Sequence, residues 1–317
     1  MLQEVGTQRW RRVLGDYSRG LPGPLLVVTG GVHGNEPGGV EALANVFATL
    51  ERLGPPLRGR VVGLVGNLCG LESGRRYVDE DLNRVWTPER VAQARNGQAP
   101  RSSEVHEQRE LLASLEEVLQ NGWESVTLLD LHSTSGAGPP FAILSDRPQN
   151  RHLVEALSVP AVFGLHRNVR GTLIDWFEAQ GHASVVLEGG QNDAPETRSR
   201  HEAAIWSALA QLGMIESDSG LDLEARRALL AESTAHLPAA IDVCLRWGIE
   251  PGERFRMEPG FANLQHVERG QLLARTGRFG EVPIRAPFDG LLVMPLYQPQ
   301  GNEGFFLGLV PRAWRLF

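Results

Sequence analysis

Three side chains of the kind that bind metal ions follow two short apolar stretches of this sequence. His33 and Glu36 lie in the glycine-rich segment TGGVHGNEPGG, directly after the apolar residues 25–29. An imidazole and a carboxylate three residues apart can converge on one cation, and catalytic zinc favours nitrogen and carboxylate ligands with one position open to water. Local hydrogen bonds can also satisfy a loop histidine and glutamate, so this pair alone leaves both interpretations open.

The second apolar stretch offers a third ligand. In TLLDLHSTSG another Leu-rich run ends in His132. If both runs are strands of one open sheet, their carboxyl ends meet where α/β proteins bind ligands, and His33, Glu36 and His132 form a two-histidine, one-glutamate set. Asp130 lies two residues before His132, so both side chains point to the same side of a strand. Asp130 either accepts a hydrogen bond from that imidazole or caps a neighbouring backbone group.

Two further segments carry polar side chains suited to a substrate. RRYVDEDLNRVW contains Arg76, Asn83 and Arg84, and arginine forks beside an asparagine amide make a good receptor for a carboxylate. VVLEGGQND places Glu188 at the end of an apolar run, where a carboxylate can take a proton from a metal-activated water. A solvated charged loop is the plain alternative for the first segment, and a helix or loop cap is the alternative for the second.

An α/β framework is needed to bring these residues together. Short Val- and Leu-rich runs alternate with longer amphipathic stretches in the first two thirds of the chain, which is typical of a sheet buried on both faces by helices. The expected strands are 25–29, 61–65, 127–131, 141–144 and 184–187. The expected helices are 38–53, 104–120, 150–157, 172–180 and 197–212.

The last third of the chain has a different character. Residues 213–235 are polar and acidic, and from about residue 236 glycine and proline recur at short intervals, which is typical of a small all-β module with tight turns. We therefore expect a catalytic domain over 1–215, a linker over 216–235 and a β-rich C-terminal domain over 236–317.

The composition limits the class of protein. The net charge of −7 argues against nucleic-acid binding, and all 31 basic residues are arginine. Without lysine, Schiff-base enzymes, pyridoxal phosphate enzymes and lysine-containing phosphate loops are excluded. No apolar run is long enough to span a membrane, and the first residues do not resemble a secretion signal. We expect a cytoplasmic protein without nucleic-acid or membrane partners, and leave open whether it forms a homo-oligomer.

The segments HGNE, RRYVDEDLNR, DLHSTSG and VVLEGG occur in this order, and in this combination the chain resembles the succinylglutamate desuccinylase/aspartoacylase family of the zinc carboxypeptidase-like superfamily. The resemblance covers most of residues 25–200. It implies a three-layer α/β/α catalytic domain with a smaller β-rich C-terminal domain. It also implies one zinc ion per chain and hydrolysis of the amide bond of an N-acylated amino acid, a small-molecule substrate bearing a carboxylate.

The resemblance assigns the central residues to roles. His33, Glu36 and His132 match the zinc ligands of the family, and Glu188 matches the glutamate that serves as general base. We therefore expect these four side chains to surround the water that attacks the amide.

The resemblance also assigns substrate contacts. Arg76 matches the arginine that polarises the scissile carbonyl, and Asn83 and Arg84 match the pair that binds the substrate α-carboxylate. The stretch MPLYQPQGNEGFF resembles a C-terminal segment that reaches into the active site, which makes Tyr297 a candidate substrate contact.

One arginine of the aspartoacylase pattern has no counterpart here. Aspartoacylases place it shortly before the catalytic glutamate, where it binds the second carboxylate of the substrate. No arginine lies between Arg170 and Glu188, and Arg167 and Arg170 do not match the spacing. We therefore expect a requirement for a free α-carboxylate and tolerance of neutral side chains. A zinc carboxypeptidase acting on peptides and a non-catalytic carboxylate-binding protein are the alternatives.

Overall fold

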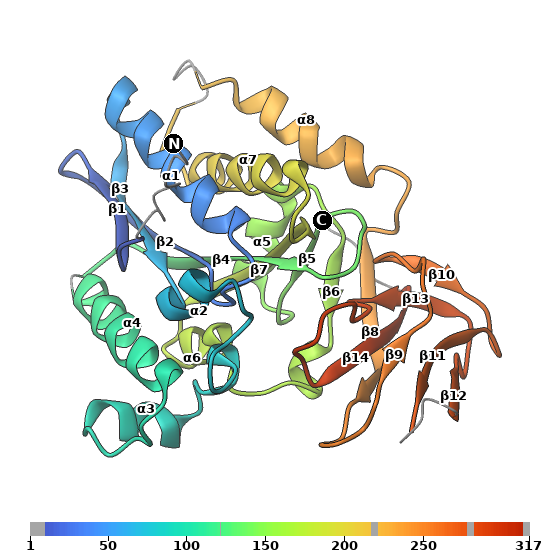
Figure 1. Ribbon diagram of the computed structural model, residues 1–317. Helices are drawn as coiled ribbons and strands as arrows, with labels where there is room; N and C mark the ends of the chain where they lie inside the picture. The colour runs from blue at the N-terminus through green and yellow to red at the C-terminus, as the bar shows by residue number, and fades with distance from the viewer. Residues whose placement is uncertain (1–9, 121, 217–220, 278–281, 313–317) are drawn as a thin grey trace, which may run out of the picture.

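A long mixed sheet forms the centre of the computed structural model, which describes residues 10–120, 122–216, 221–277 and 282–312. The strand order in this sheet is β1-β3-β2-β4-β7-β5-β6-β8-β14-β13-β10. Helices cover both faces of its first half, and strands from the last third of the chain extend its other end (Figure 1).

The strands of the first two thirds of the chain are β1 (Val13–Ser18), β2 (Leu21–Gly30), β3 (Arg58–Val65), β4 (Val126–Thr134), β5 (Phe141–Ile143), β6 (Ala161–Phe163) and β7 (Ala183–Gln191). β3, β2, β4 and β7 are parallel neighbours, whereas β1 and β5 run antiparallel to β3 and β7. All five strands expected from the sequence are present. β1 and β6 were not expected, because β1 is half exposed and β6 is only three residues long.

The helices are α1 (Gly38–Leu53), α2 (Leu68–Ser73), α3 (Pro88–Arg95), α4 (Ser103–Leu119), α5 (Pro148–Leu157), α6 (Leu173–Ala179), α7 (Pro195–Gln211) and α8 (Leu223–Thr234), with 3-10 turns η1 (Leu82–Arg84) and η2 (Leu165–Arg167). The five helices expected from the sequence are all present, and α2, α3 and α8 are additional. None of the described helices is long and apolar enough to cross a membrane.

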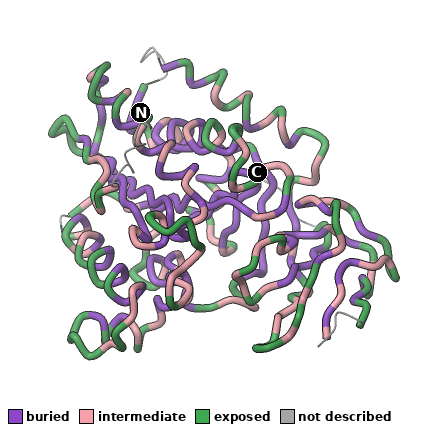
Figure 2. Tube along the Cα trace, viewed as in Figure 1, coloured by how far each residue is buried: buried purple, intermediate pink, exposed green. Residues whose placement is uncertain are grey.

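Side chains of the central strands alternate between two cores. Leu26 and Val28 of β2 pack into a core with α1, α5 and α7, whereas Leu25 and Val27 pack into a second core with α4 and α6. This alternation follows from the two-residue period of a strand. The buried strands between outer helices with exposed faces are visible in Figure 2. The three-layer α/β/α architecture expected for this part of the chain is confirmed.

The C-terminal third is β-rich, as expected. Its strands are β8 (Ala240–Gly248), β9 (Arg256–Met257), β10 (Gln265–Val267), β11 (Leu272–Thr276), β12 (Val282–Arg285), β13 (Gly290–Val293) and β14 (Glu303–Leu309). β8 pairs with β6, so β8, β14, β13 and β10 continue the central sheet, while β9, β11 and β12 form a separate three-stranded sheet. Helix α8 occupies part of the stretch expected to be a linker. The division into two domains stays a prediction.

Candidate active site

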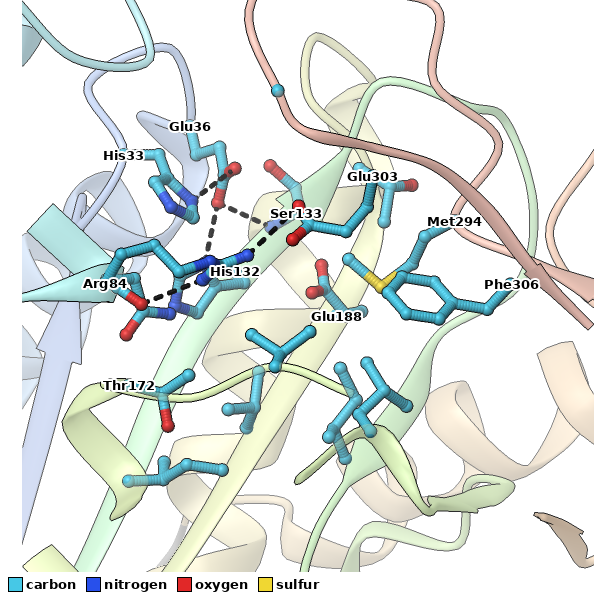
Figure 3. Close-up of a pocket in the computed structure, with 18 of the residues that line it drawn as sticks. His33, Glu36, Arg84, His132, Ser133, Thr172, Glu188, Met294, Glu303 and Phe306 are labelled. Carbon is cyan, nitrogen blue, oxygen red and sulfur yellow. Dashed lines mark hydrogen bonds and ion pairs between the residues drawn. The ribbon is translucent and has the colours of Figure 1, made fainter. Parts of the chain in front are cut away.

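His33, Glu36 and His132 come together at the carboxyl ends of β2 and β4, which are neighbours in the sheet. Their candidate ligand atoms lie within 4.8 Å of one another, and all three residues are buried. Nδ1 of His33 lies 2.9 Å from Glu36 Oε1, and Nδ1 of His132 lies 3.0 Å from Glu36 Oε2. Both imidazoles therefore face one carboxylate through the same ring nitrogen (Figure 3).

The loop after β2 depends on glycine for this placement. Gly31 has a φ of +67°, a conformation that L side chains rarely adopt. A Cβ at Gly34 would lie 1.9 Å from the carbonyl carbon of Gly70, so the loop can approach α2 only without a side chain there. The close approach holds His33 next to the end of β4.

An aspartate holds each imidazole from its other side. His132 Nε2 donates to Asp130 Oδ2 at 3.0 Å, and His33 Nε2 donates to Asp81 Oδ1 at 3.1 Å. Of the two roles considered for Asp130, the structure shows contact with the imidazole; its other oxygen accepts from Thr29 Oγ1 at 2.5 Å. Histidines that bind metals characteristically donate their second N–H to such a carboxylate. Two Nδ1 atoms and a carboxylate fit the ligand preference of zinc.

The charges of this cluster depend on one another. Burial raises the pKa of Glu36, but the charges of His33 and His132 and the hydrogen bonds from both outweigh it and hold that pKa well below its usual range. Burial lowers the pKa of His132, but Asp130 and Glu36 together raise it well above its usual value. In the absence of a cation the cluster therefore keeps a proton on His132, and a bound cation must displace it.

Glu188 lies beside this cluster, because β7 pairs with β4 and Glu188 is the register partner of His132. The side chain is buried, and its Oε2 has no hydrogen-bond partner among the described residues. Burial raises the pKa of Glu188 to about 8, although the charge of His132 acts in the opposite direction. A buried carboxyl group without a partner costs stability, and such perturbed groups in a cavity are typical of proton-transfer sites.

Arg76 approaches the cluster from the loop after α2. Its Nη1 lies 3.4 Å from Glu36 Oε1, and its Nε and Nη2 donate to Asp81 Oδ2 at 3.2 and 3.0 Å. Burial lowers the pKa of Arg76, but the charges of Asp81 and Glu36 outweigh this effect and raise it. Asp81 thus links Arg76 to His33. Its part in the site was missed from the sequence, where only the alternating acids of VDEDLNR could have signalled it.

The expected carboxylate clamp lies farther along the same segment. Asn83 Oδ1 accepts the backbone N–H of Leu173 at 2.9 Å, which leaves Nδ2 as the donor end of the amide. Arg84 Nη2 pairs with Glu303 Oε2 of β14 at 3.2 Å, and Arg246 pairs with the other oxygen of Glu303 at 3.3 Å. Glu303 is therefore the carboxylate that Arg84 meets in this structure (Figure 3).

Tyr297 does not join the site, although the sequence led us to expect a substrate contact there. The side chain is 39% exposed, and its hydroxyl donates to the carbonyl of Glu258 at 2.7 Å and accepts from the N–H of Phe261 at 2.9 Å. Its neighbours Leu296 and Gln298 line the cavity instead. The C-terminal segment thus reaches the site as expected, but with the side chains on either side of the tyrosine.

The site residues expected from the sequence, other than Tyr297, line one cavity of about 120 Å³. An engineered cavity of roughly 150 Å³ is known to hold benzene, so this space suits a small molecule. It is lined by His33, Glu36, Arg76, Asn83, Arg84, His132 and Glu188, together with side chains described below.

His201 on α7 was not expected to contribute. Its Nε2 donates to the backbone carbonyl of His132 at 2.9 Å, and burial lowers its pKa to about 4. The histidine therefore stays neutral and fixes the end of β4 below the cluster. The available signal was its spacing on the expected helix, because His201 lies on the same helix face as the buried residues Ala204, Ile205 and Ala208.

The protein-family model that describes the succinylglutamate desuccinylase/aspartoacylase catalytic domain matches residues 22–210 of this chain. A succinylglutamate desuccinylase of Burkholderia pseudomallei (strain 1710b) is 28% identical over 174 residues, which cover 52% of this chain and 49% of that protein. One from Burkholderia cenocepacia is 26% identical over 212 residues, covering 62% of this chain and 58% of the relative. The chain spans about half the length of the curated relatives it matches.

Solved structures show the same fold over nearly the whole chain. The product-bound ectoine utilization protein EutE (DoeB) of Ruegeria pomeroyi is 20% identical, with a TM-score of 0.63 over 91% of this chain and 85% of that one. A succinylglutamate desuccinylase/aspartoacylase from Rhodobacter sphaeroides is 19% identical, with a TM-score of 0.63 over 92% and 86% of the two chains. With a family model covering more than half of its residues, this chain belongs to the succinylglutamate desuccinylase/aspartoacylase family.

Proposed function

We propose that this chain is a zinc-dependent hydrolase that cleaves the amide bond of an N-acylated amino acid. The observation that carries the proposal is Glu188, which lines the same cavity as His33, Glu36 and His132. One of its carboxylate oxygens is buried and has no hydrogen-bond partner in the described part of the chain. Membership of a family whose relatives are named desuccinylases supports an acyl-amino-acid hydrolase.

The cavity residues divide the chemistry among themselves. A zinc ion held by His33, Glu36 and His132 would supply Lewis acidity and lower the pKa of water to about 7. Glu188 takes the proton of the attacking water and passes it to the amine nitrogen that leaves. The raised pKa of Glu188 suits the second step, and the positive charge of a cation would bring it down into the range of a base.

Arg76 and the carboxylate clamp act on the substrate. Arg76 donates to the carbonyl oxygen as negative charge develops on it, in a buried position where such a donor is strongest. Asn83 and Arg84 bind the α-carboxylate, and the salt bridge of Arg84 to Glu303 opens when that carboxylate enters.

The carboxypeptidase alternative requires room for a peptide. A cavity of about 120 Å³, lined in part by Leu296, Gln298 and Glu303 from the C-terminal third, favours a compact substrate over a long peptide. Release of free amine from a panel of N-acetyl amino acids and a panel of dipeptides separates the two activities. Hydrolysis of dipeptides alone would favour the carboxypeptidase.

The variant Glu188→Gln tests the mechanism. It preserves shape but removes the proton acceptor, so turnover should fall by about 100-fold or more while zinc binding is retained. Zinc content and amine release are measured on the same preparation. Near-normal turnover would assign the base to another group, and a complete absence of turnover in the wild-type protein on both panels would favour a non-catalytic carboxylate-binding protein.

The metal is tested separately. We expect close to one zinc per chain by elemental analysis, lost in His33→Ala and His132→Ala. His106→Ala is the matched control, because that side chain is 66% exposed and pairs with Glu110, which is not part of the cluster. Metal-free wild-type protein after purification without chelator would contradict the zinc proposal.

A further inference from the structure

We propose that the substrate carries an apolar side chain of about the size of leucine or methionine, bound in the part of the cavity beyond Glu188. This inference rests on the proposed function, because it names the amino acid whose N-acyl bond is cleaved. It differs from the acidic substrate in the name of the desuccinylase relatives.

An apolar wall continues the cavity from the proposed base. Val186 lies two residues before Glu188 on β7, so both side chains face the same side of the sheet. Ile143 of β5 is the register partner of Val186 and lines the same space. The wall is completed by Leu165, Ile174, Met294 and Phe306. Figure 3 shows Met294 and Phe306 on one side of Glu188 and Thr172 near Arg84, with aliphatic side chains between.

The apolar wall and the carboxylate clamp belong to one hydrogen-bonded unit. The N–H of Leu173 donates to Asn83 Oδ1, and the N–H of Trp86 donates to the carbonyl of Gly171 at 3.0 Å. Ile174 directly follows this tied segment. A substrate held at Arg84 by its α-carboxylate therefore has its own side chain beside Ile174, so the wall contacts the amino-acid part of the substrate.

The structure offers no arginine for a second carboxylate. Among the described residues, only two arginines line the cavity, Arg76 and Arg84, and both are engaged as described. Arg167 pairs with Asp242 and with the carbonyl of Val243, so it is directed away. Arg170 is exposed and does not line the cavity. An acidic side chain in this space would lose its hydration without gaining an arginine as its partner.

Two acids at the edge of the wall do not make it a site for a cationic side chain. Glu178 Oε1 accepts from Ser145 Oγ at 2.6 Å and from Asn150 Nδ2 at 2.7 Å, and its other oxygen pairs with Arg147. Asp175 closes the capping box at the start of α6, accepting from the N–H of Thr172. Glu178 and Oδ2 of Asp175 are thus committed to the protein, and the apolar wall offers the substrate burial of apolar surface.

Substrate selectivity provides the first measurement. kcat/KM is compared for the Nα-acetyl derivatives of leucine, methionine, alanine, aspartate, glutamate and ornithine on the zinc-loaded protein. Because one methylene in an apolar pocket changes kcat/KM by roughly 10- to 200-fold, leucine and methionine should exceed alanine by at least about tenfold. They should exceed aspartate by more, because a charged group must also be desolvated.

A matched pair of variants tests the wall itself. Val186→Ala removes two methyl groups from the cavity, whereas Val162→Ala removes two from the same apolar cluster at a position that does not line it. Val186→Ala should lower kcat/KM for N-acetylleucine by about tenfold, mainly through KM, and leave N-acetylalanine nearly unchanged. Val162→Ala should leave the leucine-to-alanine ratio unchanged, which separates the pocket from a general loss of stability.

Binding to the Glu188→Gln variant distinguishes the failure of this inference from failure of the proposed function. Calorimetric titration of N-acetylleucine and N-acetylaspartate needs no turnover. Tighter binding of the leucine compound by the variant, with no hydrolysis of any substrate by the wild-type protein, would overturn the function and leave the pocket standing. Hydrolysis with a preference for aspartate, glutamate or ornithine, or with less than about threefold discrimination, would overturn the pocket and leave the function standing.

Discussion

The two aspartates behind the proposed zinc-binding histidines allow a test in which the structure predicts an order of effects. Asp130 accepts from His132 at 3.0 Å, and Asp81 accepts from His33 at 3.1 Å. Removing such a partner costs roughly 10- to 100-fold in metal affinity, or about 1.4–2.7 kcal/mol. We expect both Asp130→Asn and Asp81→Asn to weaken zinc binding, by different amounts.

Position 130 tolerates an amide well. Its neighbours are the N–H of His132 and the hydroxyl of Thr29, which can accept as well as donate a hydrogen bond. An amide can give its oxygen to His132 and its N–H to Thr29. Only the negative charge is lost, so we expect a decrease of about tenfold in zinc affinity.

Position 81 has donors on every side. Oδ1 accepts from His33 and from the N–H of Asn83, while Oδ2 accepts from Nε and Nη2 of Arg76. An amide N–H₂ at this position must face one of these donors, because it has a single acceptor oxygen. We therefore expect Asp81→Asn to lose about 100-fold or more, and to release Arg76 from its position.

Zinc affinity is measured by competition with a colorimetric chelator at about pH 7 and about pH 9. Two pH values are needed because Asp130 raises the pKa of His132. In Asp130→Asn the proton therefore competes less strongly with zinc for His132, and this gain hides part of the loss in zinc affinity at the lower pH. Asp16→Asn is the control, since Asp16 pairs with Arg60 and is 42% exposed. Zinc affinities of both variants equal to that of the control, or a larger loss in Asp130→Asn than in Asp81→Asn at the higher pH, would refute the reasoning.

Two further predictions concern pH and substrate. His201 has a pKa of about 4 in the folded chain, against its ordinary value of 6.5. As the pH drops, the unfolded chain therefore binds the proton first, and the free energy of unfolding falls by about 3 kcal/mol between pH 6.5 and pH 4. Denaturant unfolding should show that His201→Gln loses less unfolding free energy than the wild-type protein as the pH is lowered. Equal losses in the two proteins would contradict this prediction. Esterifying the substrate α-carboxylate should lower kcat/KM by about 30-fold, near 2 kcal/mol. The loss stays at this size because Glu303 keeps Arg84 paired when the substrate carboxylate is missing. A loss below about threefold would show that Arg84 does not bind the α-carboxylate.

Local patterns were sufficient for the strands that carry the site. Runs such as LLVVTG and TLLDLH are apolar enough to be buried on both faces, so the positions of His33 and His132 at strand ends followed from the sequence. The same holds for Glu188. β1 and α3 lack this signal, because their side chains are largely exposed.

Contacts between distant segments could not be derived from the sequence. The salt bridge from Arg84 to Glu303 joins residues that are 219 positions apart. The hydroxyl of Tyr297 bonds to Glu258 and Phe261 through contacts that no motif encodes. Glycine- and proline-rich spacing indicates β-structure after residue 236, but it does not say which sheet these strands join.

The pairing of β8 with β6 also decides what can be cut from this protein. Val162 of β6 lies opposite Ile241 of β8, and both are fully buried. Truncation after α8 would keep every residue proposed to touch zinc, yet it would turn β6 into an open apolar edge. Such edges pair with other chains and aggregate. For expression or for transplanting the site into another scaffold, the minimal unit is therefore the whole continuous sheet, including the strands that contribute nothing to the metal.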